Sequence, residues 1–152
     1  MTDERGSVVG WTLVLPVLVL VVFFGLVYLH LGEIRAVVAS CAREGARYYG
    51  TWCDNPNREA GMDDAKARTM TRMRVFYSLQ ERGLVSPEAV YPMAPGRFDA
   101  INDLRLIDDG TWIRCELTYH FPNPLPRLTV ADWWPSSFTI QAAGAARHEI
   151  GN

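Results

Sequence analysis

Few side chains in this sequence have the type and spacing that catalysis or metal binding requires. The histidines His30, His120 and His148 lie far apart and fit neither the H-E-x-x-H nor the C-x-x-C spacing of zinc sites. The sequence has no glycine-rich loop of the nucleotide-binding types, and no serine stands in a G-x-S-x-G turn. We therefore expect a protein that is not an enzyme and carries no cofactor.

Acidic side chains gather around one predicted turn, at Asp99, Asp103, Asp108 and Asp109. Hard divalent cations bind through several oxygen ligands, so this stretch could in principle hold an ion. The solvated rim of a hairpin is the simpler interpretation, and we assign no metal ligand.

The three cysteines differ in their predicted surroundings. Cys41 falls on an apolar helix face and Cys115 points inward from a strand, where free cysteine packs like a small apolar residue. Cys53 lies in a predicted loop. If the domain lies outside the cell, one disulfide can form and one thiol is left over. We favour the pair Cys53–Cys115 and keep three reduced thiols as the alternative.

The element that dominates the chain is an uncharged run from Val8 to Leu29, in which 16 of 22 residues are Val, Leu or Phe. As a helix this run spans about 33 Å, enough to cross a bilayer. A cleaved secretory signal has a shorter apolar core and ends at a small-residue site, which is absent at positions 30–33. We therefore expect a leader and transmembrane anchor in residues 1–31, with membrane lipid as a partner, and a folded domain in residues 32–152.

The charged residues leave the orientation open. Fourteen Arg and one Lys against 17 acids give a net charge of −2, without the basic surface that nucleic-acid binding needs. Arg5 precedes the apolar run whereas Arg35, Arg43 and Arg47 follow it, which favours a cytoplasmic domain. The cysteines favour a domain outside the cell instead.

Helical periodicity continues beyond the apolar run. Apolar residues recur at i, i+3, i+4 and i+7 on one face, with Arg43 and Arg47 on the other. The apolar set is Ile34, Val37, Val38, Cys41, Gly45, Tyr48 and Tyr49. We predict one helix from Ser7 to Tyr49, followed by a loop over residues 50–57.

A second helix is predicted over residues 63–82, with Gly83 just past its end. Met70, Met73 and Tyr77 share one stripe, which we expect to face the core. The solvated face is expected to carry Arg68, Arg72 and Arg74.

Alternating apolar and polar residues then predict antiparallel strands. The pair Asp109-Gly110 is a two-residue hairpin signal, which would place Leu106 opposite Ile113 and Leu104 opposite Cys115. A last strand is expected to face inward with Phe138, Ile140 and Ala142. We predict an α+β fold, in which the long N-terminal helix and the second helix cover one face of a sheet of three or four strands.

Four stretches follow one another in a distinctive order. They are Arg5-Gly6-Ser7 with Leu13-Val14-Leu15-Pro16; Ala42–Arg47, which reads AREGAR; Leu117–Pro126, a strand running into a proline-rich loop; and the closing strand Phe138–Arg147. In this layout, and most specifically in its first 50 residues, the chain resembles the TadE-like family of pilus-assembly proteins, relatives of the type IV pilins.

The resemblance implies a minor pilin or pseudopilin of a Tad-type (Flp) pilus or secretion system. It implies a single pass through the cytoplasmic (inner) membrane, a pilin-like head outside, and partnership with other pilin-like subunits and the membrane platform. It also implies cleavage by a prepilin peptidase between Gly6 and Ser7. The family's glutamate in the apolar segment is absent, because Gly10 stands there. Gly10, Trp11 and Pro16 belong to the helix that would pack against sister helices.

A second interpretation, from another class, is a membrane-tethered extracytoplasmic binding or sensor module unrelated to pili. Association with pilin-like chains would separate the two. A tethered hydrolase lacks the necessary nucleophile and base.

Overall fold

The computed structural model describes residues 3–53, 63–85, 98–122 and 137–148. In chain order they form helix α1 (Asp3–Cys53), helix α2 (Asp64–Glu81) and strands β1 (Leu104–Asp108), β2 (Trp112–Pro122) and β3 (Ser137–Arg147). The described strands make one antiparallel sheet in the order β1-β2-β3. The predicted α+β class is confirmed. The chain divides into two compact units, Met1–Ile34 and Arg35–Asn152.

Helix α1 has 51 residues and extends past both predicted ends. Pro16 lies inside it and lacks the N–H group that a helical residue donates. The predicted loop is wrong for residues 50–53, which form the last helical turn. Gly50 is buried, and a Cβ there would lie 3.3 Å from Cδ1 of Ile113, so packing against β2 favours the helical conformation. Residues 54–57 of the predicted loop lie outside the described residues.

Helix α2 begins and ends close to the predicted residues. Asp63 is its N-cap residue in extended conformation, and its carbonyl accepts the first helical hydrogen bonds. At the other end Gly83 adopts a φ of 72°, and the N–H of Leu84 donates to the carbonyl of Leu79 at 2.9 Å. Glycine tolerates this left-handed conformation, and the arrangement closes the helix.

The buried face of α2 is not the predicted one. Met73 and Tyr77 are about half exposed, at 53% and 51%, and Met70 is half-buried. The residues that are buried instead are Ala67, Thr71, Val75, Ser78 and Leu79. These smaller side chains let α2 approach α1: a Cβ on Gly45 would lie only 2.7 Å from Cγ2 of Val75.

The hairpin between β1 and β2 has a longer connection than predicted. Leu106 pairs with Cys115 and Leu104 pairs with Leu117, so the predicted register is wrong by two residues. Four residues, 109–112, separate the pair Asp108–Ile113, and the Asp109 carboxylate accepts hydrogen bonds from two N–H groups within this turn. Because side chains alternate with a period of two, the shift leaves the same residues facing the core.

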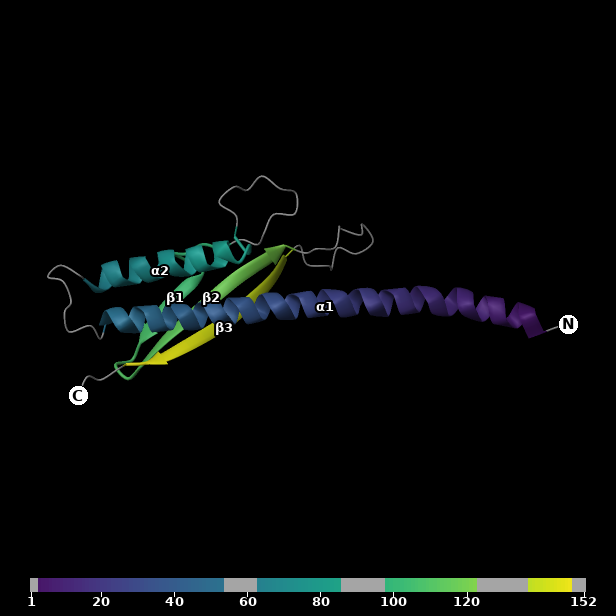
Figure 1. Cartoon of the computed structure of the whole chain (residues 1–152), viewed down its shortest axis with the longest axis horizontal. Helices are drawn as coiled ribbons and strands as arrows, with labels where there is room; N and C mark the ends of the chain where they lie inside the picture. Colours follow the sequence, from purple (N-terminus) through teal and green to yellow (C-terminus); the bar gives the residue numbers. More distant parts are fainter. Residues whose placement is uncertain (1–2, 54–62, 86–97, 123–136, 149–152) are drawn as a thin grey trace. The chain divides into compact units, whose positions relative to one another are not determined.

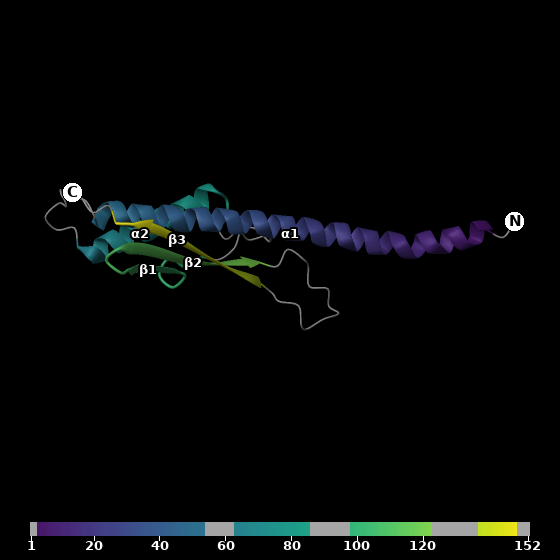
Figure 2. The same cartoon turned by 90° about the horizontal axis from the view of Figure 1, so that it is seen from below.

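One face of the sheet carries the helices. Figures 1 and 2 show α2 and residues 35–53 of α1 lying together over the strands. The inward residues of β2 and β3 match the prediction, and Phe121, Phe138 and Ala142 are only half-buried. The core of this unit includes Val38, Cys41, Ala42, Ala46, Tyr49, Ala67, Val75, Leu79, Leu104, Leu106, Ile113, Cys115, Leu117, Tyr119 and Ile140. Burial of their apolar surface is the main force holding both helices to the sheet.

Candidate functional site

The AREGAR segment of α1 presents its residues in three directions. Ala42 and Ala46 are fully buried against the fold, and Gly45 packs under Val75 and Cys115. The two arginines, at positions 43 and 47, are exposed. The small residues therefore let α1 lie close to its neighbours, while the charged ones remain on its outer surface.

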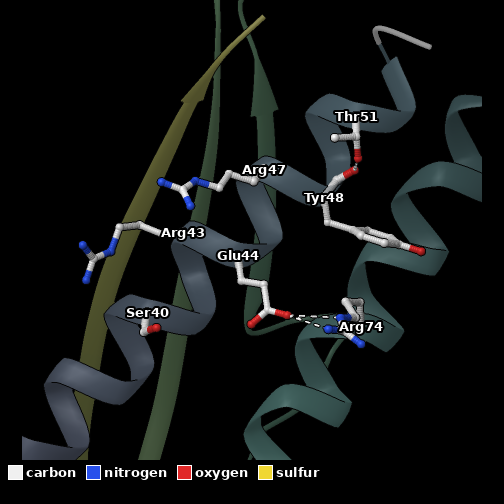
Figure 3. A pocket seen from close by; sticks show the side chains of 7 residues that line it. All are labelled: Ser40, Arg43, Glu44, Arg47, Tyr48, Thr51 and Arg74. Atoms are coloured by element: carbon white, nitrogen blue, oxygen red, sulfur yellow. Dashed lines mark hydrogen bonds and ion pairs between the residues drawn. The ribbon is translucent and has the colours of Figure 1, made fainter. Parts of the chain in front are cut away.

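Glu44 links this segment to α2. Its Oε1 accepts a hydrogen bond of 3.1 Å from Nε of Arg74, whose Nη2 lies 3.0 Å from the same oxygen. Its Oε2 accepts 3.0 Å from the buried hydroxyl of Ser78 and lies 3.8 Å from Nη2 of Arg82. Figure 3 shows Glu44 reaching toward Arg74. This network is not predicted from the sequence, where its one indication is a single acid in a motif of otherwise small and basic residues.

An open hollow of about 620 Å³ lies along the outer side of α1. We call it the arginine groove, and its lining consists of Ser40, Arg43, Glu44, Arg47, Tyr48, Thr51 and Arg74. In Figure 3 Arg43 and Arg47 point to the side away from Arg74. Three guanidinium groups and one carboxylate give the lining a formal charge of +2, whereas the whole chain carries −2. The groove is therefore a positively charged surface on a protein whose net charge is negative.

A second polar cluster joins α1, α2 and β1. The hydroxyl of Tyr49 donates to Asp64, and Nε of Arg68 donates to the same carboxylate at 2.8 Å. The Arg68 Nη1 also donates to the carbonyl of Leu106 at 3.0 Å, and its guanidinium lies 5.5 Å from the centre of the Tyr49 ring. Burial and the bond to Asp64 raise the pKa of Tyr49. These contacts hold α1, α2 and β1 together. The prediction that Arg68 lies on a solvated face is therefore wrong.

None of the three cysteines forms a disulfide in the structure, so the favoured pair Cys53–Cys115 is not joined. Cys115 packs against Gly45 of α1, because a Cβ added to Gly45 would lie 3.1 Å from Sγ of Cys115. Cys53 lies eight residues after Gly45 in the same helix, a distance of about 12 Å along the axis. This distance is too long for a disulfide between Cys53 and Cys115. Burial raises the pKa of Cys115 to about 12 and also raises the pKa of Cys41. Buried neutral thiols of this kind are poor nucleophiles.

The four acids of the predicted acidic stretch interact with backbone N–H groups and with two histidines. Asp99 and Asp103 accept hydrogen bonds from nearby backbone N–H groups, and Asp103 lies 3.4 Å from Nε2 of His120. Oδ1 of Asp108 lies 2.9 Å from Nε2 of His148. Within the described parts of the chain, no three His, Cys, Asp or Glu side chains are grouped as metal ligands would be.

The N-terminal unit presents an apolar surface. Large side chains such as Trp11, Leu13 and Tyr28 are 68%, 70% and 78% exposed. Within α1, a window of 18 residues has a mean hydropathy of 2.8 and none of it is buried. This helix is long and apolar enough to cross a membrane.

The residues expected to act in processing and assembly lie in this same helix. Gly6, Ser7 and Gly10 are within α1, as is Pro16, and Trp11 is among its exposed residues. No side chain in residues 3–10 is described. The predicted cleavage between Gly6 and Ser7 therefore stays a prediction.

The chain was compared with known protein families, with curated proteins and with solved structures, and none matches.

Proposed function

We propose that this chain is a membrane-anchored, non-enzymatic minor pilin or pseudopilin that takes part in the assembly of a Tad-type pilus or secretion system. The observation that supports it most is the exposed apolar surface of α1 over residues 11–29. Such a surface requires lipid or other apolar helices around it, because water contact is unfavourable. A pilin-like subunit meets this requirement in both of its states, because its apolar helix is surrounded by lipid before assembly and by the helices of other subunits after it.

In this proposal the N-terminus lies in the cytoplasm and the α+β domain outside the inner membrane. Other pilin-like subunits and the membrane platform are the partners. The AREGAR segment, on which the resemblance to the family rests, packs α1 onto the domain through its small residues Ala42, Gly45 and Ala46.

The test is purification of the full chain from membranes of cells that contain a Tad-type system, with mass spectrometry of its native N-terminus. We expect a chain that begins at Ser7 and that co-purifies with pilin-like subunits. The matched control is Gly6→Val, which should block cleavage and leave membrane insertion unchanged. A native chain that still begins at Met1 or Thr2 contradicts the processing step. A chain that remains dispersed in buffer without detergent or lipid contradicts the anchor itself.

A membrane-tethered binding module is the alternative, and one observation favours it. Gly10 takes the place of the glutamate that the resembled family carries in its apolar segment, so a contact used in filament growth is missing. Membrane insertion without any pilin-like chain in the purified material would favour this alternative over the pilin role.

A further inference from the structure

We propose that the arginine groove binds an acidic helical segment of a partner protein, whose carboxylates pair with Arg43 and Arg47. The proposal does not depend on the pilus role, because it applies equally to an assembly subunit and to a tethered binding module. It rests on three properties of the groove. Two of its arginines have no described ion-pair partner, its one carboxylate is already bound by residues of α2, and its lining forms a straight, open stripe.

The first property is the supply of unpaired guanidinium groups. Nε of Arg43 donates to the carbonyl of Ala39 at 3.3 Å, and no described carboxylate balances its positive charge. Within the described residues, no carboxylate lies within ion-pair distance of Arg43 or Arg47, whereas Arg68, Arg74 and Arg82 each have one. Both unpaired side chains are exposed and lie one helical turn apart.

The second property is that the groove's own acid is already in use. The carboxylate of Glu44 accepts hydrogen bonds from Arg74 and Ser78 and forms an ion pair with Arg82. All three residues belong to α2 or its C-cap. Turning Glu44 toward Arg43 or Arg47 would leave the buried hydroxyl of Ser78 without this acceptor. The positive charge at the outer rim is therefore retained for an external anion.

The third property is the shape of the lining. The α1 residues in it follow the spacing i, i+3, i+4, i+7, i+8 and i+11, a straight stripe about 16 Å long. A small anion is better held by an enclosed pocket, whereas an open stripe of this length matches three turns of a second helix. Glutamates at i and i+4 on that helix would have the spacing of the two arginines. The ring of Tyr48 packs edge-on against that of Trp52, with 6.0 Å between the ring centres. It offers an aromatic contact beside the two arginines.

The experiment measures binding of a fluorescent helical peptide with Glu at i and i+4 to the full chain in phosphatidylcholine nanodiscs, by anisotropy. We expect saturable binding that weakens as salt is raised. The variant Arg43→Gln/Arg47→Gln should bind about tenfold more weakly. The matched control is Arg105→Gln/Arg114→Gln, which removes the same charge from the exposed side of the sheet and should bind like the original chain.

Further arms separate the possible sources of the anion. The same peptide with Gln in place of Glu should not bind, and inorganic phosphate at millimolar concentration should not displace the acidic peptide. Three outcomes would overturn the proposal: no peptide binding, equal loss in both arginine variants, or an effect of Arg43 and Arg47 seen only as adhesion to phosphatidylglycerol vesicles. Unfolding midpoints of both variants, measured in parallel, should match that of the original chain, because neither pair contributes a described ion pair.

Discussion

Gly144 of β3 lies directly against the backbone of Ala42 in α1. A Cβ built at position 144 would come 2.5 Å from the carbonyl oxygen of Ala42 and would also meet the backbone nitrogen of Arg43. Both obstacles are main-chain atoms inside a helix, which cannot rotate away as a side chain can. The position of α1 over β3 therefore requires glycine at this point of the strand.

We predict that Gly144→Ala lowers the free energy of unfolding by about 3 kcal/mol, because α1 must move away from the sheet. The measurement is denaturant unfolding of the detergent-solubilised chain. The matched control is Ala145→Val, which adds two methyl groups to the next residue on the exposed side and should change stability little. An unchanged unfolding midpoint for Gly144→Ala would contradict the close approach of α1 and β3.

A second prediction concerns Gly45, where a Cβ would meet side chains and not backbone. Its nearest neighbours would be Cγ2 of Val75 at 2.7 Å and Sγ of Cys115 at 3.1 Å. We expect Gly45→Ala to cost about 1–3 kcal/mol. Combined with Val75→Ala, which frees that space, it should cost less than the sum of the single changes. Additive costs in this double-mutant cycle would show that the two residues do not meet.

Thiol reactivity should differ among the three cysteines. Because burial raises the pKa of Cys115 to about 12 and also raises that of Cys41, neither forms a thiolate near neutral pH. We expect a maleimide reagent at pH 8 to label Cys53 alone in the native chain and all three thiols in denaturant. Two thiols that resist labelling in denaturant until a reductant is added would instead establish a disulfide.

The buried thiols also predict how stability depends on alkaline pH. The folded pKa of Cys115 is raised, so its contribution is complete below the unfolded value of about 9 and is lost as pH rises toward 12. We expect the free energy of unfolding to fall over this window. Cys115→Ala should reduce the slope, whereas Cys53→Ala should change it less. Equal slopes in the Cys115→Ala and original chains would contradict this account.

Acid should weaken the hairpin through Asp108. Its partial burial opposes ionisation, but hydrogen bonds from His148 and from the N–H of Gly110 outweigh that effect and lower its pKa. Stability from this carboxylate is therefore present above about pH 3.8 and is lost as pH falls through the lower folded pKa. We expect Asp108→Asn to flatten the stability profile below pH 4, measured as the thermal midpoint. Gln141→Ala, an exposed change on β3 that removes no carboxylate and no described side-chain hydrogen bond, should leave the slope unchanged.

The sequence alone determined the features that repeat locally. Apolar spacing along α1 predicted the buried Val38, Cys41, Gly45 and Tyr49, but it wrongly included Tyr48, which lines the arginine groove, and it missed the buried Ala42 and Ala46. Alternation along β2 predicted the inward side chains from Ile113 to Phe121. Asp63 and Gly83 marked the ends of α2 because capping depends on residues next to one another in the chain. An uncharged run of 22 residues was enough to predict the long apolar helix.

The tertiary structure decided everything that depends on residues distant in sequence. The register of β1 against β2 could not be read from alternation, because a shift of two residues preserves both faces. The buried side of α2 was set by how closely Val75 and Ser78 could approach α1, and this favoured small side chains over the larger Met73 and Tyr77. Glu44 and Arg74, 30 positions apart, meet only because the two helices lie side by side. With Glu44 held there, Arg43 and Arg47 have no ion-pair partner among the residues that the structure describes.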